Sequence, residues 1–76
     1  ENQLYRDAKS LFQEKAQDKV GITPTYEVLK EWGPDHARNF EVGVYLEKEL
    51  VASGQGPSKQ EAQQAAASEA LKKKNW

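Results

Sequence analysis

FEVGVYL, residues 40–46, is the clearest strand signal in this 76-residue sequence. Large apolar side chains occupy every second position there: Phe40, Val42, Val44 and Leu46. Successive side chains of an extended chain point to opposite faces, so Glu41, Gly43 and Tyr45 fall on the other side. The pattern predicts a strand with one buried face.

The segments on either side predict two further strands. TYEVLKEW (25–32) comes before, separated by GPDHARN (33–39), whose glycine, proline, aspartate and asparagine are typical of a turn. ELVASG (49–54) comes after a short turn at residues 47–48. The side chains expected to face inward from these two strands are Tyr26, Val28, Leu50 and Ala52. Three consecutive strands with short turns predict an antiparallel meander.

A helix is predicted before the strands. Asp7 is a suitable N-cap, and Gly21 is expected to end the helix near Val20. Apolar residues recur at helical spacing along one stripe, at Ala8, Leu11, Phe12 and Ala16. The opposite face is polar but mostly uncharged, with Ser10, Gln13, Glu14 and Gln17.

A second helix is predicted to open at Ser58, which forms a capping box with Glu61. Its apolar side is almost entirely alanine, at Ala62, Ala66, Ala67 and Ala70, and ends with Leu71. Such small side chains allow the helix axis to lie close to a sheet. The unpaired N–H groups at its start also form a suitable anion site, beside Ser58 and Lys59.

These elements predict one α+β domain, α-β-β-β-α, with a three-stranded antiparallel sheet and both helices packed on one face. We expect the domain to span residues 7–74. Residues 1–6 are interpreted as a linker remnant from an absent N-terminal domain, since the chain begins at Glu1 and contains no methionine.

Composition excludes several classes of protein. The absence of cysteine excludes a disulfide scaffold and a cysteine-ligated zinc site, and it favours a reducing, cytoplasmic setting. No apolar run approaches the roughly 20 residues of a membrane helix, so no membrane partner is expected. The net charge of −1 argues against a nucleic-acid binder, but screening over about 8 Å makes local charge decisive.

Four segments together resemble a known family. DAKSLFQE, PTYEV, GPDHARNFEVGV and GQGPSKQEAQQAAASEAL are similar, in this order and spacing, to the double-stranded RNA-binding domain. The resemblance covers about residues 7–71. The sequences of the last two segments are most similar to the C-terminal domain of bacterial ribonuclease III.

The resemblance implies three RNA-contacting surfaces, because A-form RNA offers two minor grooves and the phosphates between them over roughly 16 base pairs. The implied contact residues are Ser10, Gln13 and Glu14 on the first helix, His36 and Arg38 in the 33–39 loop, and Ser58, Lys59, Gln60 and Gln63 on the second helix. Groups that bond a 2′-hydroxyl would discriminate against DNA.

Several of these residues also have ordinary structural explanations. The polar stripe of the first helix is what a solvated surface looks like, and Arg38 could pair with Glu27 or Glu31 instead. The family usually carries lysines where Gln60 and often Gln63 stand, so we expect weaker and less salt-sensitive binding than in a typical member.

The resemblance implies that the chain is the non-catalytic, substrate-binding part of a double-strand-specific endoribonuclease. Divalent metal, Mg²⁺, is expected only in the absent nuclease domain, and the whole enzyme is expected to be a homodimer through that domain. No cofactor and no small-molecule ligand are expected here. The alternative is a protein–protein interaction domain of the same fold with weakened RNA binding; a stand-alone enzyme fits least, since so small a layer has little room for a pocket.

Overall fold

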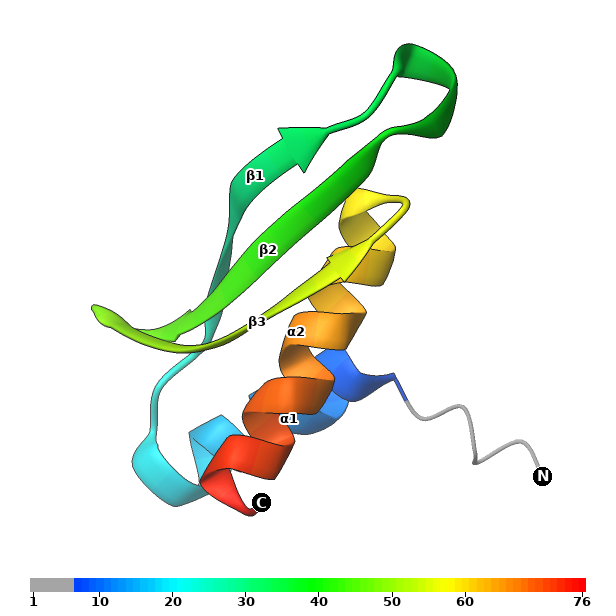
Figure 1. Cartoon of the computed structure of the whole chain (residues 1–76). Helices are drawn as coiled ribbons and strands as arrows, with labels where there is room; N and C mark the ends of the chain where they lie inside the picture. Colours follow the sequence, from blue (N-terminus) through cyan, green and yellow to red (C-terminus); the bar gives the residue numbers. More distant parts are fainter. Residues whose placement is uncertain (1–6) are drawn as a thin grey trace, which may run out of the picture.

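Six elements follow one another in the computed structural model of the chain, which describes residues 7–76 (Figure 1). They are α1 (Ala8–Val20), β1 (Thr25–Trp32), the short 3-10 helix η2 (Asp35–Ala37), β2 (Asn39–Leu46), β3 (Glu49–Gly56) and α2 (Lys59–Lys74). The predicted order of helix, three strands and helix is confirmed. The predicted linker at residues 1–6 lies outside the described residues.

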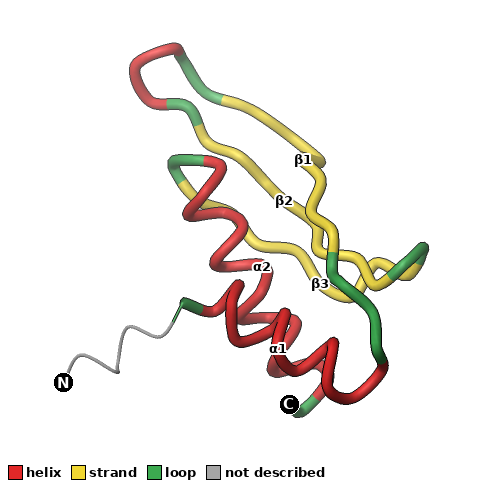
Figure 2. Tube along the Cα trace, turned by 180° about the vertical axis from the view of Figure 1, so that it is seen from behind, coloured by secondary structure: helices red, strands yellow, loops and turns green. Residues whose placement is uncertain are grey.

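The three strands form one antiparallel sheet in the order β1-β2-β3. Both helices lie on the same side of this sheet, with α2 against it and α1 beside α2 (Figure 2). The α+β class and the packing of both helices on one face are therefore confirmed.

Both helices begin where the sequence predicts, and α1 also ends there. An Asp7 carboxylate oxygen accepts a hydrogen bond from the Lys9 N–H at 3.1 Å, and Ser58 Oγ accepts one from the Glu61 N–H at 3.1 Å. Such caps satisfy N–H groups that have no partner within the helix. Gly21 ends α1 in the left-handed conformation, with φ of 68°.

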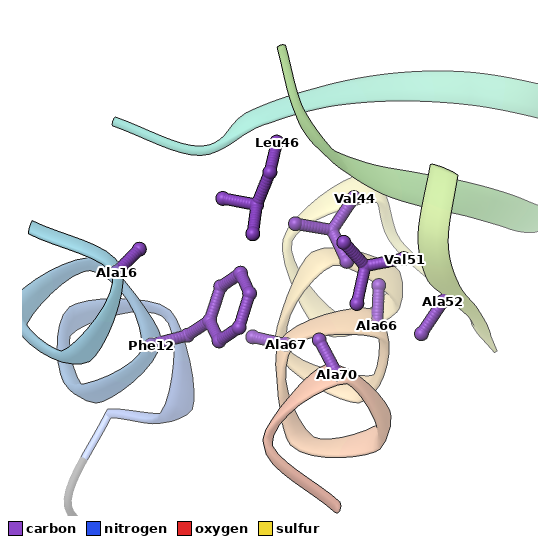
Figure 3. Close-up of a cluster of buried hydrophobic side chains, with 9 residues drawn as sticks. All are labelled: Phe12, Ala16, Val44, Leu46, Val51, Ala52, Ala66, Ala67 and Ala70. Carbon is purple, nitrogen blue, oxygen red and sulfur yellow. The ribbon is translucent and has the colours of Figure 1, made fainter. Parts of the chain in front are cut away.

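The core lies between the sheet and the two helices (Figure 3). Phe12 reaches from α1 toward Leu46 and the α2 alanines, and it is fully buried. The predicted alanine stripe is confirmed, because Ala62, Ala66, Ala67 and Ala70 are all fully buried. One core contact was not predicted: the ring of Trp76 stacks on Phe12 with 5.3 Å between the ring centroids.

The prediction that Leu50 faces inward is wrong. Ala52 lies opposite Val44, but Leu50 lies opposite Tyr45, so β3 has one extra residue between them. This bulge turns Val51 into the core, where it is 5% exposed, and leaves Leu50 50% exposed on the outer face. A one-residue shift reverses the face of every side chain beyond it, which is why strict alternation failed here.

Val28 is also less buried than predicted, with 39% of its surface exposed. Its partner in the ladder, Val42, is fully buried. The difference arises because α2 packs on β3 and β2, while β1 is the edge strand farthest from that helix.

Replacing Tyr26 by phenylalanine is expected to leave the fold intact and to raise its free energy of unfolding by about 1 kcal/mol. The Tyr26 hydroxyl is buried and has no hydrogen-bond partner within residues 7–76, and a buried unsatisfied polar group costs about 1–3 kcal/mol. Burial also raises the pKa of this phenol to about 12. Urea denaturation of both proteins measures the difference; a loss of more than about 1 kcal/mol would show that the hydroxyl has a stabilising partner.

Candidate nucleic-acid interface

The outer face of α1 brings three of the predicted contact residues together. Ser10, Gln13 and Glu14 line a shallow hollow on the surface, together with Gln17 and Asp18. The Ser10 hydroxyl donates to Asp7 Oδ2 at 3.1 Å, so its oxygen remains available as an acceptor. This face can therefore accept hydrogen bonds from hydroxyl groups of a ligand.

The loop between β1 and β2 carries His36 at its tip, on the exposed helix η2. Position 33, at the start of this loop, requires glycine. Its φ is 98°, and a Cβ there would lie 2.5 Å from the carbonyl oxygen of Ala37. The glycine thus lets the backbone turn sharply, and the loop between β1 and β2 extends beyond the end of the sheet (Figure 1).

Arg38 lies at the end of the same loop and makes an ion pair. Its Nη2 is 2.6 Å from Glu31 Oε1, and its Nη1 is 3.6 Å from Asp35 Oδ1. Of the two acidic partners considered from the sequence, Glu31 is the one contacted. All three side chains are at least 40% exposed, and exposed pairs contribute only about 0–1 kcal/mol, so a phosphate can compete for the guanidinium.

The start of α2 lies at the same end of the sheet as this loop (Figures 1 and 2). Gly56, near the end of β3, is opposite Phe40 at the start of β2. The Lys59 ammonium lies 5.8 Å from the centroid of the Phe40 ring. Ser58 and the exposed Lys59 therefore lie at the positive end of the α2 dipole, at the same end of the sheet as the His36 loop.

The two glutamines predicted as contact residues have different surroundings. Gln60 is exposed and lines a cleft of about 270 Å³ between the start of α1 and the first turns of α2. The Gln63 oxygen accepts a hydrogen bond from Lys9 Nζ at 2.6 Å. Lys9 was missed by sequence reasoning, although a lysine in the first turn of a helix, at the positive end of its dipole, is a signal worth noting.

Gln64 ties the two helices together. Its amide nitrogen donates to Asp7 Oδ1, and its oxygen accepts from the Lys9 N–H at 3.3 Å. The hydrogen bond from Gln64, more than any other contact, holds the pKa of the Asp7 carboxyl below its usual value. This contact fixes the start of α1, and hence its outer face, relative to α2.

A family model described as "Double-stranded RNA binding motif" matches residues 8–74 of the chain. Among curated proteins, Ribonuclease 3 of a Nitratiruptor species is 51% identical over 91% of the chain and 30% of that relative. Ribonuclease 3 of Natranaerobius thermophilus is 44% identical over 96% of the chain and 32% of the relative. The chain thus spans about a third of the length of the curated relatives that it matches.

Two solved structures resemble the chain in fold and sequence. The structure of Arabidopsis HYL1, described with its implications for miRNA processing, superposes with a TM-score of 0.77 at 32% identity, covering 93% of this chain and all of that one. The structure of Dicer from Pichia stipitis superposes with a TM-score of 0.69 at 30% identity, covering 87% of this chain and 32% of that one.

Proposed function

Because the chain belongs to the double-stranded RNA-binding motif family and binds double-stranded RNA, we propose that it holds the RNA substrate of a ribonuclease III-type endoribonuclease. Cleavage itself is assigned to the rest of that protein. The support for this parentage is the high identity to Ribonuclease 3 proteins of several bacteria, of which this chain matches about a third.

In the proposed complex, three surfaces lie along one face of an A-form duplex. Ser10, Gln13 and Glu14 on α1 bond 2′-hydroxyls in one minor groove. His36 enters the next minor groove, with Arg38 near its edge. Ser58, Lys59, Gln60 and Gln63 at the start of α2 hold the phosphates between the two grooves.

The observation that carries this assignment is the Lys59–Phe40 contact. It places the cation of α2 at the end of the sheet from which the His36 loop projects. A phosphate-binding group and a groove-binding loop then lie at the same end of the sheet, as contact with successive grooves requires.

We place the remaining functions of the enzyme outside this domain. Within residues 7–76, no three His, Asp or Glu side chains gather in a way that could hold a metal ion, so the Mg²⁺ needed for cleavage is assigned to the rest of the protein. Dimerisation of the whole enzyme is likewise proposed to use that part.

In the described part of the chain, neither α-helix is long and apolar enough to cross a membrane. We propose a cytoplasmic location, consistent with the lack of cysteine.

Fluorescence anisotropy with a labelled duplex of about 20 base pairs tests the binding mode, since the family footprint is roughly 16 base pairs. We expect RNA to bind at least tenfold more tightly than DNA of the same sequence. The His36→Ala and Gln13→Ala variants should lose much of this preference, whereas Lys73→Ala, at the far end of α2, should keep it. Equal binding of RNA and DNA by the wild type would refute the proposed mode.

A second candidate function is protein–protein interaction through the outer face of the sheet. It is favoured by Leu29 and Leu50, which are 40% and 50% exposed. The two side chains are neighbours on this face, because both lie within about 3 Å of the position that a Cβ at Gly43 would occupy. If this is the main role, the Leu50→Lys variant should leave RNA binding unchanged and disrupt a complex seen by size-exclusion chromatography of the full-length protein.

A further inference from the structure

The start of α2 carries little positive charge of its own. Residues 57–66 contain one cation, Lys59, and one anion, Glu61. The other lysines of α2 lie at residues 72–74, about 20 Å along the axis from Lys59 at 1.5 Å per residue. Two of them already have acidic partners, because Lys72 Nζ is 3.5 Å from Glu69 and Lys74 Nζ is 3.5 Å from Glu49. They stabilise the far end of the helix.

A second cation reaches this region from the other helix. Lys9 Nζ lies 2.6 Å from the Gln63 oxygen and 5.2 Å from the centroid of the Tyr26 ring. Both of these groups are neutral, so neither contact cancels the ammonium charge. The carboxylates of Asp7 and Glu61 line the same cleft as Lys9, and that of Asp7 accepts hydrogen bonds from donors of α1 and from Gln64.

The Lys9–Gln63 contact also fixes the orientation of an amide. An ammonium group can only donate hydrogen bonds, so the oxygen of Gln63, and not its nitrogen, must face Lys9. The amide NH₂ of Gln63 is then directed away from Lys9, as a donor for another acceptor. Gln64 differs, because both ends of its amide are used between the helices.

The charge of Lys9 has a cost as well as a structural benefit, since the ammonium also lies over the Tyr26 ring. A cation in the first turn of a helix opposes the helix dipole by about 0.3–1 kcal/mol. A neutral donor would make the same hydrogen bond to Gln63 without this penalty. What the lysine adds is a positive charge beside the exposed start of α2.

We propose that Lys9 is a further RNA-binding residue: its ammonium neutralises a phosphate held at the start of α2, and it orients Gln63 so that the amide NH₂ donates to the same backbone. The phosphate-binding surface thus includes α1 as well as α2. This inference rests on the proposed RNA-binding mode.

The Lys9→Gln variant tests the charge, and Lys9→Arg restores it. We expect Lys9→Gln to bind a 20-base-pair RNA about fivefold more weakly and to lower the slope of log affinity against log salt by about 0.9, as loss of one phosphate contact does. Lys9→Arg should recover the slope. Gln63→Ala should weaken the wild type but have little further effect in a Lys9→Ala background, because alanine has no donor to orient the Gln63 amide. Lys73→Gln is the matched control and should change neither quantity.

Footprinting of the wild-type protein avoids any effect of the substitutions on folding. Acetylation of lysine amines, followed by mass spectrometry, should show Lys9 and Lys59 protected by the RNA duplex and Lys73 unprotected. Lys9 is only structural if it reacts equally with and without RNA while Lys59 is protected. The same conclusion follows if Lys9→Gln keeps the wild-type salt slope while Lys59→Gln lowers it. If Lys59 is not protected either, the proposed binding mode itself fails.

Discussion

The Gly54→Ala variant is expected to lose at least about 3 kcal/mol of its free energy of unfolding, the upper end of the cost of overpacking. A Cβ at Gly54 would lie 2.3 Å from the Ala66 nitrogen and 2.5 Å from the Ala65 carbonyl carbon. These are backbone atoms of α2, so the whole helix must move to make room. Movement of α2 would also open its contacts with Val44 and Val51 in the core.

The size of this effect matters for so small a domain. At roughly 0.05–0.15 kcal/mol per residue, the whole domain is stable by about 4–11 kcal/mol. A loss of 3 kcal/mol should lower the melting temperature by about 12 °C or more. Thermal unfolding followed by circular dichroism measures the change directly.

Gly43→Ala is the matched control for Gly54→Ala, since both glycines lie inside the sheet. A Cβ at Gly43 would meet the ends of the Leu50 and Leu29 side chains at 2.9 and 3.0 Å. Exposed leucine ends can rotate away, so we expect a change within about 1 kcal/mol. Equal losses in the two variants would show that the close approach of α2 to β3 is not the cause.

Lys59→Ala is expected to weaken binding of a 20-base-pair RNA duplex by at least about tenfold. A hydrogen bond to a charged group contributes about 1.5–3 kcal/mol, and 1.4 kcal/mol corresponds to a factor of ten. The exposed Lys59 ammonium lies beside the N-terminus of α2, where phosphate is most strongly attracted. Loss of this cation should also lower the salt slope by about 0.9.

Anisotropy titrations at several salt concentrations measure both quantities for Lys59→Ala. Lys73→Ala removes the same charge from an exposed site in the last turn of α2 and should behave as the wild type. Thermal melting should show Lys59→Ala folded, because Ser58 and not Lys59 caps the helix. If the two variants bind RNA equally well, the start of α2 is not the phosphate site.

Most of the fold was predictable because its signals are local. The alternation in β2, the caps at Asp7 and Ser58, and the alanine stripe of α2 each depend on residues a few positions apart. Helix and strand periods report such short-range order well. The choice of contact residues on α1, on the loop and at the start of α2 came instead from the resemblance to the family.

The environments of the contact residues were less predictable. The sequence left Glu27 and Glu31 as alternative ion-pair partners of Arg38, and the geometry of the turn brings Glu31 into contact with it. Gln63 was predicted as an RNA-contact residue, and it also receives a hydrogen bond from Lys9, 54 residues away. Pairings across such a separation depend on where the helices cross, and no local pattern encodes the crossing point.

The sequence by itself determined the elements, their order, the residues that start both helices and the glycine that ends α1, because periodicity and capping act within one or two turns. Only the tertiary structure decided the face of Leu50, since a bulge in strand pairing reverses alternation without any mark in the sequence. It also decided that Lys9 joins the start of α2, because the Asp7–Gln64 contact brings together two helices that lie at opposite ends of the chain.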